Sequence, residues 1–176
     1  MDDTGPYARD VQACAHAARG GQLEALAWLR VMHGCPWNED TCAYAAFGGQ
    51  LAALQWLRER GCPWNADSCT AAAGEGHLEI LQWAREHDCP WDEHTCKAAA
   101  SSGDLEVLKW AREHHCPWDW TTYAVAALSG HTPMLRWVRE HGCPAAVDTG
   151  TGGMVEAEAE AEAEADEEGE SSEEEE

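Results

Sequence analysis

The sequence lacks the features that mark several large classes of protein. No run of 18 or more apolar residues occurs among its 176 residues, so no membrane-spanning helix is expected. The first residues, Met1-Asp2-Asp3-Thr4-Gly5, are acidic and have no apolar core, so we expect no signal peptide and an intracellular protein with reduced cysteines. Only 11 Lys and Arg stand against 33 acidic residues. This balance argues against direct nucleic-acid binding, because phosphate contacts need basic side chains.

Motifs for catalysis and for metal binding are also missing. The chain has no HExxH, no phosphate-cradling glycine loop, and no Ser/His/Asp or Cys/His set at a fixed spacing. Cysteines such as Cys35 and Cys42 are separated by six residues, whereas zinc sites favour two to four. The position seven residues after Cys116 is occupied by Tyr123 instead of a cysteine, and no cysteine lies seven residues before Cys14. We therefore expect no catalytic residue, no metal site and no cofactor, and we interpret the nine cysteines as small core residues.

What the sequence does have is a unit that repeats every 27 residues. The tripeptide Cys-Pro-Trp begins at Cys35, Cys62, Cys89 and Cys116, and a shortened Cys143-Pro144 follows at the same interval. A second tryptophan recurs in step, at Trp56, Trp83, Trp110 and Trp137. A fixed period of this length is typical of a solenoid, in which each unit buries its apolar face only against its neighbours. We interpret both sets of tryptophans as core residues.

One unit, residues 35–61, shows the expected local structure. Asn38 is a favourable helix N-cap, and Glu39 and Asp40 follow in the first turn, where the helix dipole favours acids. These residues predict a helix over 39–47 that ends at a Gly48-Gly49 turn, and a second helix over 50–60 that ends at Gly61. About seven residues remain for the two connections, which leaves no room for strands.

A degenerate unit precedes the four regular ones. The segment 17–23 matches 45–51 at an offset of 28 residues, which places one inserted residue between Trp28 and Gly34. Arg9 replaces the tryptophan of Cys-Pro-Trp, as suits an N-terminal cap. We predict an N-terminal extension at 1–7 and a repeat domain at 8–144, with units at about 8–34, 35–61, 62–88, 89–115 and 116–142.

The repeat resembles the ankyrin repeat family. The segment Gly76-His77-Leu78-Glu79-Ile80-Leu81-Gln82-Trp83 is similar to that family's Gly-His-Leu-Glu-Val-Val-Lys-Leu, and Ala72-Ala73 matches its alanine pair. The family unit is about 33 residues long, and the residues missing here fall where the family has its β-hairpin finger. The resemblance implies an all-α solenoid of about five short helix-turn-helix units without fingers. Its compact form is most similar to ankyrin-type proteins of giant viruses and algae. If the chain is viral, this resemblance implies a location in the host cytoplasm.

This resemblance also implies the function, which is non-catalytic binding of another protein as a scaffold or adaptor, by a monomer. In the family the first helices line the concave side, so we looked there for positions that vary between units. The candidate partner-binding residues are Tyr44, Phe47, Lys97, Trp120 and Leu128. The alternative is that these side chains only pack against neighbouring helices. A third option is that the chain acts as an adaptor of a ubiquitin ligase. Because no F-box is recognisable in the sequence, another subunit would have to make the contact with the ligase.

The last segment, 145–176, holds 14 of the 33 acidic residues and no basic one. Such dense like charge predicts a disordered acidic tail. The tail is either a solvating or slippage-expanded segment, or a ligand for basic proteins. The second option gives the alternative function: an acidic-tail protein that binds partners such as histones, with the repeats as carrier.

Overall fold

The computed structural model describes residues 11–145. The predicted N-terminal extension, Arg9 and the acidic tail beyond Ala145 lie outside the described residues. Over 11–145 the chain forms ten α-helices and one π-helical turn, with no strand, which confirms the all-helical prediction. No helix in this range combines the length and apolarity needed to cross a membrane.

The helices alternate along the chain between a first and a second helix of each unit. The first helices are α1 (Val11–Arg19), α3 (Glu39–Phe47), α5 (Ala66–Gly74), α7 (Glu93–Ser102) and α9 (Trp120–Leu128). The second helices are α2 (Leu23–Ala27) with η1 (Trp28–Met32), α4 (Leu51–Glu59), α6 (Leu78–Glu86), α8 (Leu105–Glu113) and α10 (Thr132–Glu140). The helix predicted over 39–47 is thus observed at the same residues, and the one predicted over 50–60 is one residue shorter at each end.

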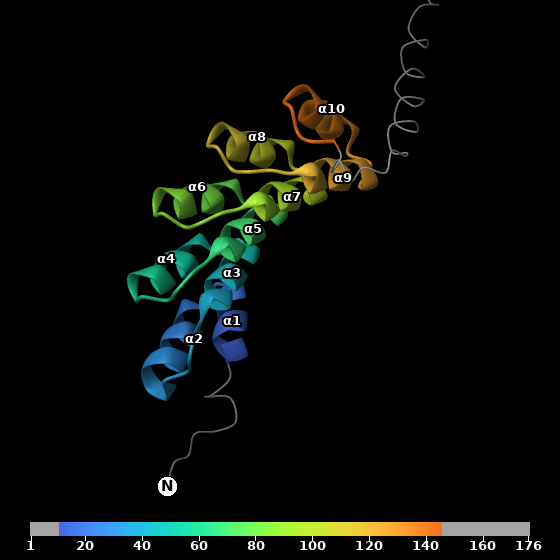
Figure 1. The fold of residues 1–176 in the computed structure, drawn as a ribbon. Coiled ribbons are helices and arrows are strands. Elements are labelled where there is room, and N and C mark those ends of the chain that lie inside the picture. Colours follow the sequence, from blue (N-terminus) through green and yellow to red (C-terminus); the bar gives the residue numbers. More distant parts are fainter. Residues whose placement is uncertain (1–10, 146–176) are drawn as a thin grey trace, which may run out of the picture. The chain divides into compact units, whose positions relative to one another are not determined.

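The first helices lie side by side in one curved row, and the second helices stand along its outer side (Figure 1). The closest helix contacts run from α1 to α3, α5, α7 and α9 in turn, and each second helix packs on the first helix of its own unit. Successive first helices approach closely because the alanine pairs, such as Ala45-Ala46 and Ala72-Ala73, lie between them and are fully buried. The described part of the chain is therefore an ordered series of helix pairs.

Side-chain caps fix the start of each regular first helix. The side chain of Asn38 forms a capping box with Thr41. Equivalent carboxyl or amide oxygens of Asn65, Asp92 and Asp119 accept the backbone N–H two residues later, at 3.0–3.1 Å. These bonds satisfy N–H groups that the helix itself leaves unpaired. The caps predicted from the repeat are confirmed.

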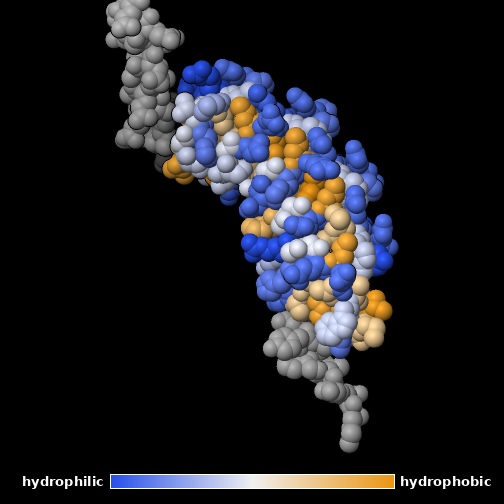
Figure 2. Space-filling model, turned by 180° about the vertical axis from the view of Figure 1, so that it is seen from behind, coloured by the Kyte–Doolittle hydropathy of each residue, from blue (hydrophilic) through white to orange (hydrophobic). Residues whose placement is uncertain are grey.

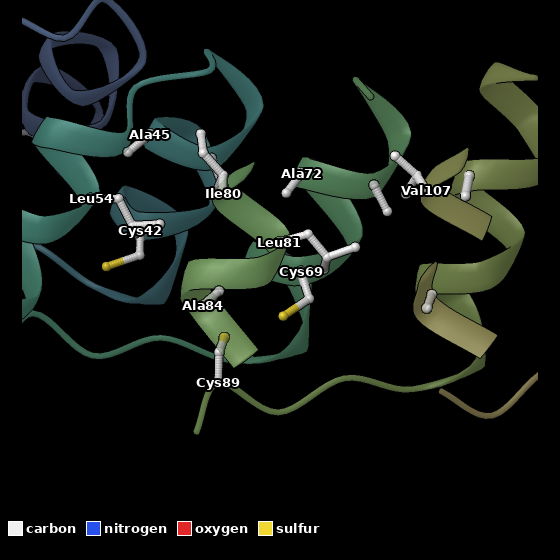
Figure 3. Close-up of a cluster of buried hydrophobic side chains, with 14 of the residues drawn as sticks. Cys42, Ala45, Leu54, Cys69, Ala72, Ile80, Leu81, Ala84, Cys89 and Val107 are labelled. Atoms are coloured by element: carbon white, nitrogen blue, oxygen red, sulfur yellow. The ribbon is translucent and has the colours of Figure 1, made fainter. Parts of the chain in front are cut away.

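The core is continuous along the helix pairs. Leu54, Leu81 and Leu108 occupy equivalent positions in the second helices and have no exposed surface. Figure 3 shows Leu54 and Leu81 beside the small residues of the first helices, Cys42 and Cys69 among them. On the side seen in Figure 2, apolar surface forms an interrupted stripe between hydrophilic side chains, with smaller separate patches beside it. The predicted core tryptophans pack against this core but remain half-buried.

The first unit carries the inserted residue as a π-helical turn, η1 (Trp28–Met32). A π-turn holds one more residue than an α-turn. The extra residue of this unit is therefore accommodated by a wider turn near the end of its second helix. Val31 and Met32 in this turn are 72% and 70% exposed, whereas the other units have a glutamate followed by an arginine or a histidine here. The change of offset in the repeat located the insertion, and the structure shows that it takes the form of a π-helical turn.

Candidate binding surface

The exposed face of the first helices carries two parallel rows of side chains. In α3 these rows are represented by Tyr44 and Phe47, three residues apart and hence on one helix face, turned away from the buried Ala45 and Ala46. The first row is His16, Tyr44, Ala71, Ala98 and Val125; the second is Arg19, Phe47, Gly74, Ser101 and Leu128. Each row crosses all five first helices.

At one end of the rows aromatic and basic side chains meet across α1 and α3. The ring of His16 packs edge-on against Tyr44, with ring centroids 6.1 Å apart. The guanidinium of Arg19 lies 4.5 Å from the centre of the Phe47 ring, in cation–π geometry. Phe47 remains 38% exposed. The structure therefore brings two of the five predicted residues, Tyr44 and Phe47, into one cluster.

In the middle of the rows, on α5 and α7, the side chains are small. Ala71, Gly74, Ala98 and Ser101 occupy the four positions. A Cβ built on Gly74 would touch only the Cβ of Ala98, at 3.5 Å, which is an ordinary contact. The middle of the rows thus carries only small, partly exposed residues between larger side chains on α3 and α9. Such small residues let a partner helix or strand approach closely.

At the other end of the rows Leu128 is 88% exposed at the last residue of α9. It lies in the same row as Phe47 but three helices away, roughly 25–30 Å at usual helix spacings. Trp120, 42% exposed, starts the same helix eight residues earlier, about 12 Å along its axis. Trp120 therefore does not join the rows.

Lys97 occupies a third set of positions, which borders the next helix. It is half-buried on α7. Its counterpart on α5, Thr70, has its hydroxyl 3.4 Å from that of Thr95 on the following helix. The five predicted residues are therefore spread over one face, and only Tyr44 and Phe47 are neighbours.

The charges on this face are unevenly distributed. Acidic side chains occupy the first turns, with Glu39 and Asp40 on α3, Asp67 on α5 and Glu93 on α7. The two rows themselves contain no acid, and Arg19 and His16 supply their only basic groups. The face thus has an acidic edge beside the first turns and a largely apolar band beside the last turns.

A second aromatic array lies on the linkers, and sequence analysis missed its main partner. In each regular unit the two tryptophans meet edge to face, with centroids 5.8–6.1 Å apart. An arginine from the preceding second helix covers the linker tryptophan, as Arg58 covers Trp64 at 4.1 Å. A histidine covers the second tryptophan in three of these units, as His87 covers Trp83 at 4.2 Å. In the remaining unit Arg60 lies over Trp56 at 4.1 Å. The 27-residue recurrence of Arg58, Arg85 and Arg112 was the signal that could have revealed this array.

Within residues 11–145 one trio of side chains has donor atoms close enough to share a metal ion: Asp92, Glu93 and His94. Asp92 already accepts the backbone N–H of His94 at 3.0 Å as the cap of α7. The positive end of a helix dipole also disfavours a bound cation. We therefore assign these residues to helix capping.

In comparisons with known proteins, no protein-family model and no curated protein matches the chain.

Proposed function

We propose that the chain is a non-catalytic interaction protein, an ankyrin-like α-solenoid that binds another protein through the exposed face of its first helices. The observation that carries the proposal is the pair of rows on that face. Large side chains at Tyr44, Phe47 and Leu128 stand at the two ends, and the small residues of α5 and α7 lie between them. In protein–protein interfaces a few large side chains usually contribute most of the binding free energy.

The charge pattern narrows the class of partner. The acidic edge at Glu39, Asp40 and Asp67, together with the net charge of −22, favours a segment that carries basic residues on one side. The apolar band favours apolar side chains on its other side. An amphipathic basic helix has both features. We accordingly propose a monomer that binds a protein, and neither nucleic acid nor membrane.

The variant Gly74→Arg tests the proposal. Gly74 is the last residue of α5, and a Cβ there would make only one ordinary contact, with Ala98. Arginine is a better helix former than glycine and is favourable at a helix C-terminus, so the fold should be kept. Its bulk and charge would obstruct the middle of the face. We expect partner affinity to fall at least tenfold without loss of stability.

The matched control is Ala52→Arg, which adds the same charge at an exposed position of α4, on the outer side. Both variants and the parent chain would serve as baits for affinity capture, followed by titration with the captured partner. A partner that binds all three equally would contradict the proposal.

A fourth bait, ended after Ala145, separates the solenoid from the tail. Capture that requires residues 146–176 and disappears at about 0.5 M salt would favour the acidic-tail function instead, because salt screens exposed charges. Capture that survives both changes would favour the helix face.

A further inference from the structure

The nine cysteines are all buried and occupy two positions in the repeat. The helix cysteines are Cys14, Cys42, Cys69 and Cys96, on first helices; the linker cysteines are Cys35, Cys62, Cys89, Cys116 and Cys143. Each linker cysteine from Cys62 onward reaches back to the first helix of the preceding unit. The Sγ of Cys62 lies 3.5 Å from the carbonyl oxygen of Asn38, the cap residue one turn before Cys42. Cys89 and Cys116 contact Asn65 and Asp92 in the same way, at 3.5 and 3.4 Å.

This arrangement places the linker cysteine of each unit against the helix cysteine of the unit before it. Each linker thiol lies close enough to this helix thiol for the neighbour to raise its pKa: Cys42 acts on Cys62, and Cys69 acts on Cys89. In the same way Cys96 raises the pKa of Cys116, and Cys35 helps burial to raise that of Cys14. The Sγ of Cys96 also lies 4.0 Å from the carbonyl oxygen of Cys116. Figure 3 shows the sulfur atoms of Cys69 and Cys89 directed toward one another.

These pairs differ from the spacing that is most visible in the sequence. Cysteines seven positions apart, such as Cys35 and Cys42, belong to different pairs, and the two members of a pair are 20 or 21 positions apart. With this pairing Cys14 and Cys116 both have partners. Only Cys143 is left over, because Tyr123 replaces the helix cysteine of the last unit. One pair thus lies at each of the four boundaries between units.

Burial keeps these thiols protonated. Contact with Cys42 and burial raise the pKa of the Cys62 thiol, and Cys89 and Cys116 are affected in the same way by Cys69 and Cys96. Since thiolates are the reactive form, the closed protein should react slowly. Opening of one boundary would expose one pair at a time, as expected where contacts link only nearest neighbours.

We propose that the four cysteine pairs are disulfide-forming sites, which a peroxide converts into one covalent cross-link at each boundary between units. Peroxide oxidises one thiol of a pair to a sulfenic acid and is itself reduced to water. The sulfur of the partner then displaces the sulfenic oxygen, which leaves as a second water with the remaining thiol proton. Two thiols and one hydrogen peroxide thus give one disulfide and two waters. The cross-links would fasten neighbouring units that otherwise only pack together.

The test uses the full reduced chain, treated with hydrogen peroxide until its free thiols no longer decrease. The remaining thiols are then alkylated in denaturant, and intact mass and peptide maps are recorded. We expect four disulfides, each lowering the mass by about 2 Da, and one alkylated residue, Cys143. The maps should join Cys14 to Cys35, Cys42 to Cys62, Cys69 to Cys89 and Cys96 to Cys116. Oxidised chain should also unfold at a higher urea concentration, and a dithiol should reverse this shift.

Three variants serve as controls. Cys62→Ala should give three disulfides and leave Cys42 and Cys143 alkylated. Cys143→Ala should keep all four disulfides. Tyr123→Cys should add a fifth, to Cys143, and leave no thiol to alkylate. Fewer than four disulfides, bonds between chains, mapped pairs other than these, or sulfinic acid as the main product would overturn the proposal.

Discussion

The guanidinium of Arg85 lies over the indole of Trp91, 4.3 Å from its centroid, and donates a hydrogen bond to the carbonyl oxygen of Cys89. One side chain thus holds both ends of the Cys-Pro-Trp tripeptide that begins the next unit. Arg30, Arg58 and Arg112 make the same two contacts with Trp37, Trp64 and Trp118 and with the cysteine carbonyls. The last turn of each second helix therefore fixes the linker that follows it.

Loss of this contact should destabilise the protein. Arg85→Ala removes a cation–π contact worth about 0.5–2 kcal/mol and leaves a carbonyl without its donor, so we expect the free energy of unfolding to fall by roughly 1–3 kcal/mol. Urea denaturation measures it. Arg139→Ala is the matched control, because Arg139 occupies the same position but Ala145 replaces the tryptophan; its cost should stay within about 0.5 kcal/mol. Equal costs for the two variants would show that the tryptophan contact contributes nothing.

The turn between the two helices of a unit makes a second contact across units. Gly49 has a φ of +72°, and a Cβ there would lie 2.9 Å from the Cε1 atom of His77 in the next unit. The Nε2 atom of His77 is 3.3 Å from the carbonyl oxygen of Phe47. His77 therefore lies directly over the turn.

Gly49→Ala should consequently cost more than the same change at Gly61. Gly61 has a similar φ of +77° but no atom within 4 Å of a built Cβ, so Gly61→Ala should show only the left-handed backbone cost of about 1–2 kcal/mol. We expect Gly49→Ala to exceed it by at least about 1 kcal/mol, the usual size of an overpacking effect. Adding His77→Ala should remove this excess. Indistinguishable urea midpoints for the two glycine variants would contradict the contact.

The core makes a simpler prediction. Leu81 has no exposed surface in the middle unit, so Leu81→Ala should cost roughly 2–5 kcal/mol. Leu128→Ala, at a leucine that is 88% exposed, should change stability by less than about 0.5 kcal/mol. Both are read from urea denaturation of the full chain. A cost below about 0.5 kcal/mol for Leu81→Ala would disprove the packing between helix pairs.

Much of the helical architecture was predictable, because the signals that set it are local. The ends of each helix are set by cap residues such as Asn38, by the Gly48-Gly49 turn and by the constant period. The observed bounds of α3 and α4 agree with the predicted ones to within one residue. The insertion before Gly34 was likewise visible as a change of offset. Its π-helical form was not, since only the rest of the helix decides whether an extra residue widens or lengthens it.

Contacts between units were harder to predict than helices within a unit. The period gives the position of every cysteine, but not which neighbouring thiol each one faces. The sequence spacing drew attention to Cys35 and Cys42, whereas in the structure Cys42 lies beside Cys62. The candidate surface shows the same limit. Variability between units identified Tyr44 and Phe47, which share one face of α3, but also Trp120, which lies at the opposite end of its helix from Leu128. The partner-binding role of all five residues remains a prediction.

The buried thiols should also make stability depend on pH in the alkaline range. Burial, aided by contact with Cys35, raises the pKa of the Cys14 thiol to about 12, and burial raises that of Cys143 to about 11, from an ordinary value of 9.0. The pKa values of Cys62, Cys89 and Cys116 are raised as well, chiefly by the hydrogen bond with the partner thiol. A thiol with a raised pKa keeps its proton more tightly in the folded state than in the unfolded state. Its stabilising effect is therefore complete below the unfolded pKa and is lost as the pH rises toward the folded pKa.

We thus expect these thiols to cause no change in the free energy of unfolding between pH 7 and about 8, when it is measured with a reductant present. Above pH 9 it should fall, by up to about 1.4 kcal/mol per pH unit for each such thiol. Cys143→Ala should make the fall shallower by one thiol's share, because that variant has one proton fewer to lose on unfolding. Cys35→Ala should also make the fall shallower, because it removes the partner that helps to raise the pKa of Cys14. A free energy of unfolding that is unchanged between pH 8 and pH 10.5 would mean that the thiols ionise as easily in the folded chain as in the unfolded one, and hence that they are not packed as the structure places them.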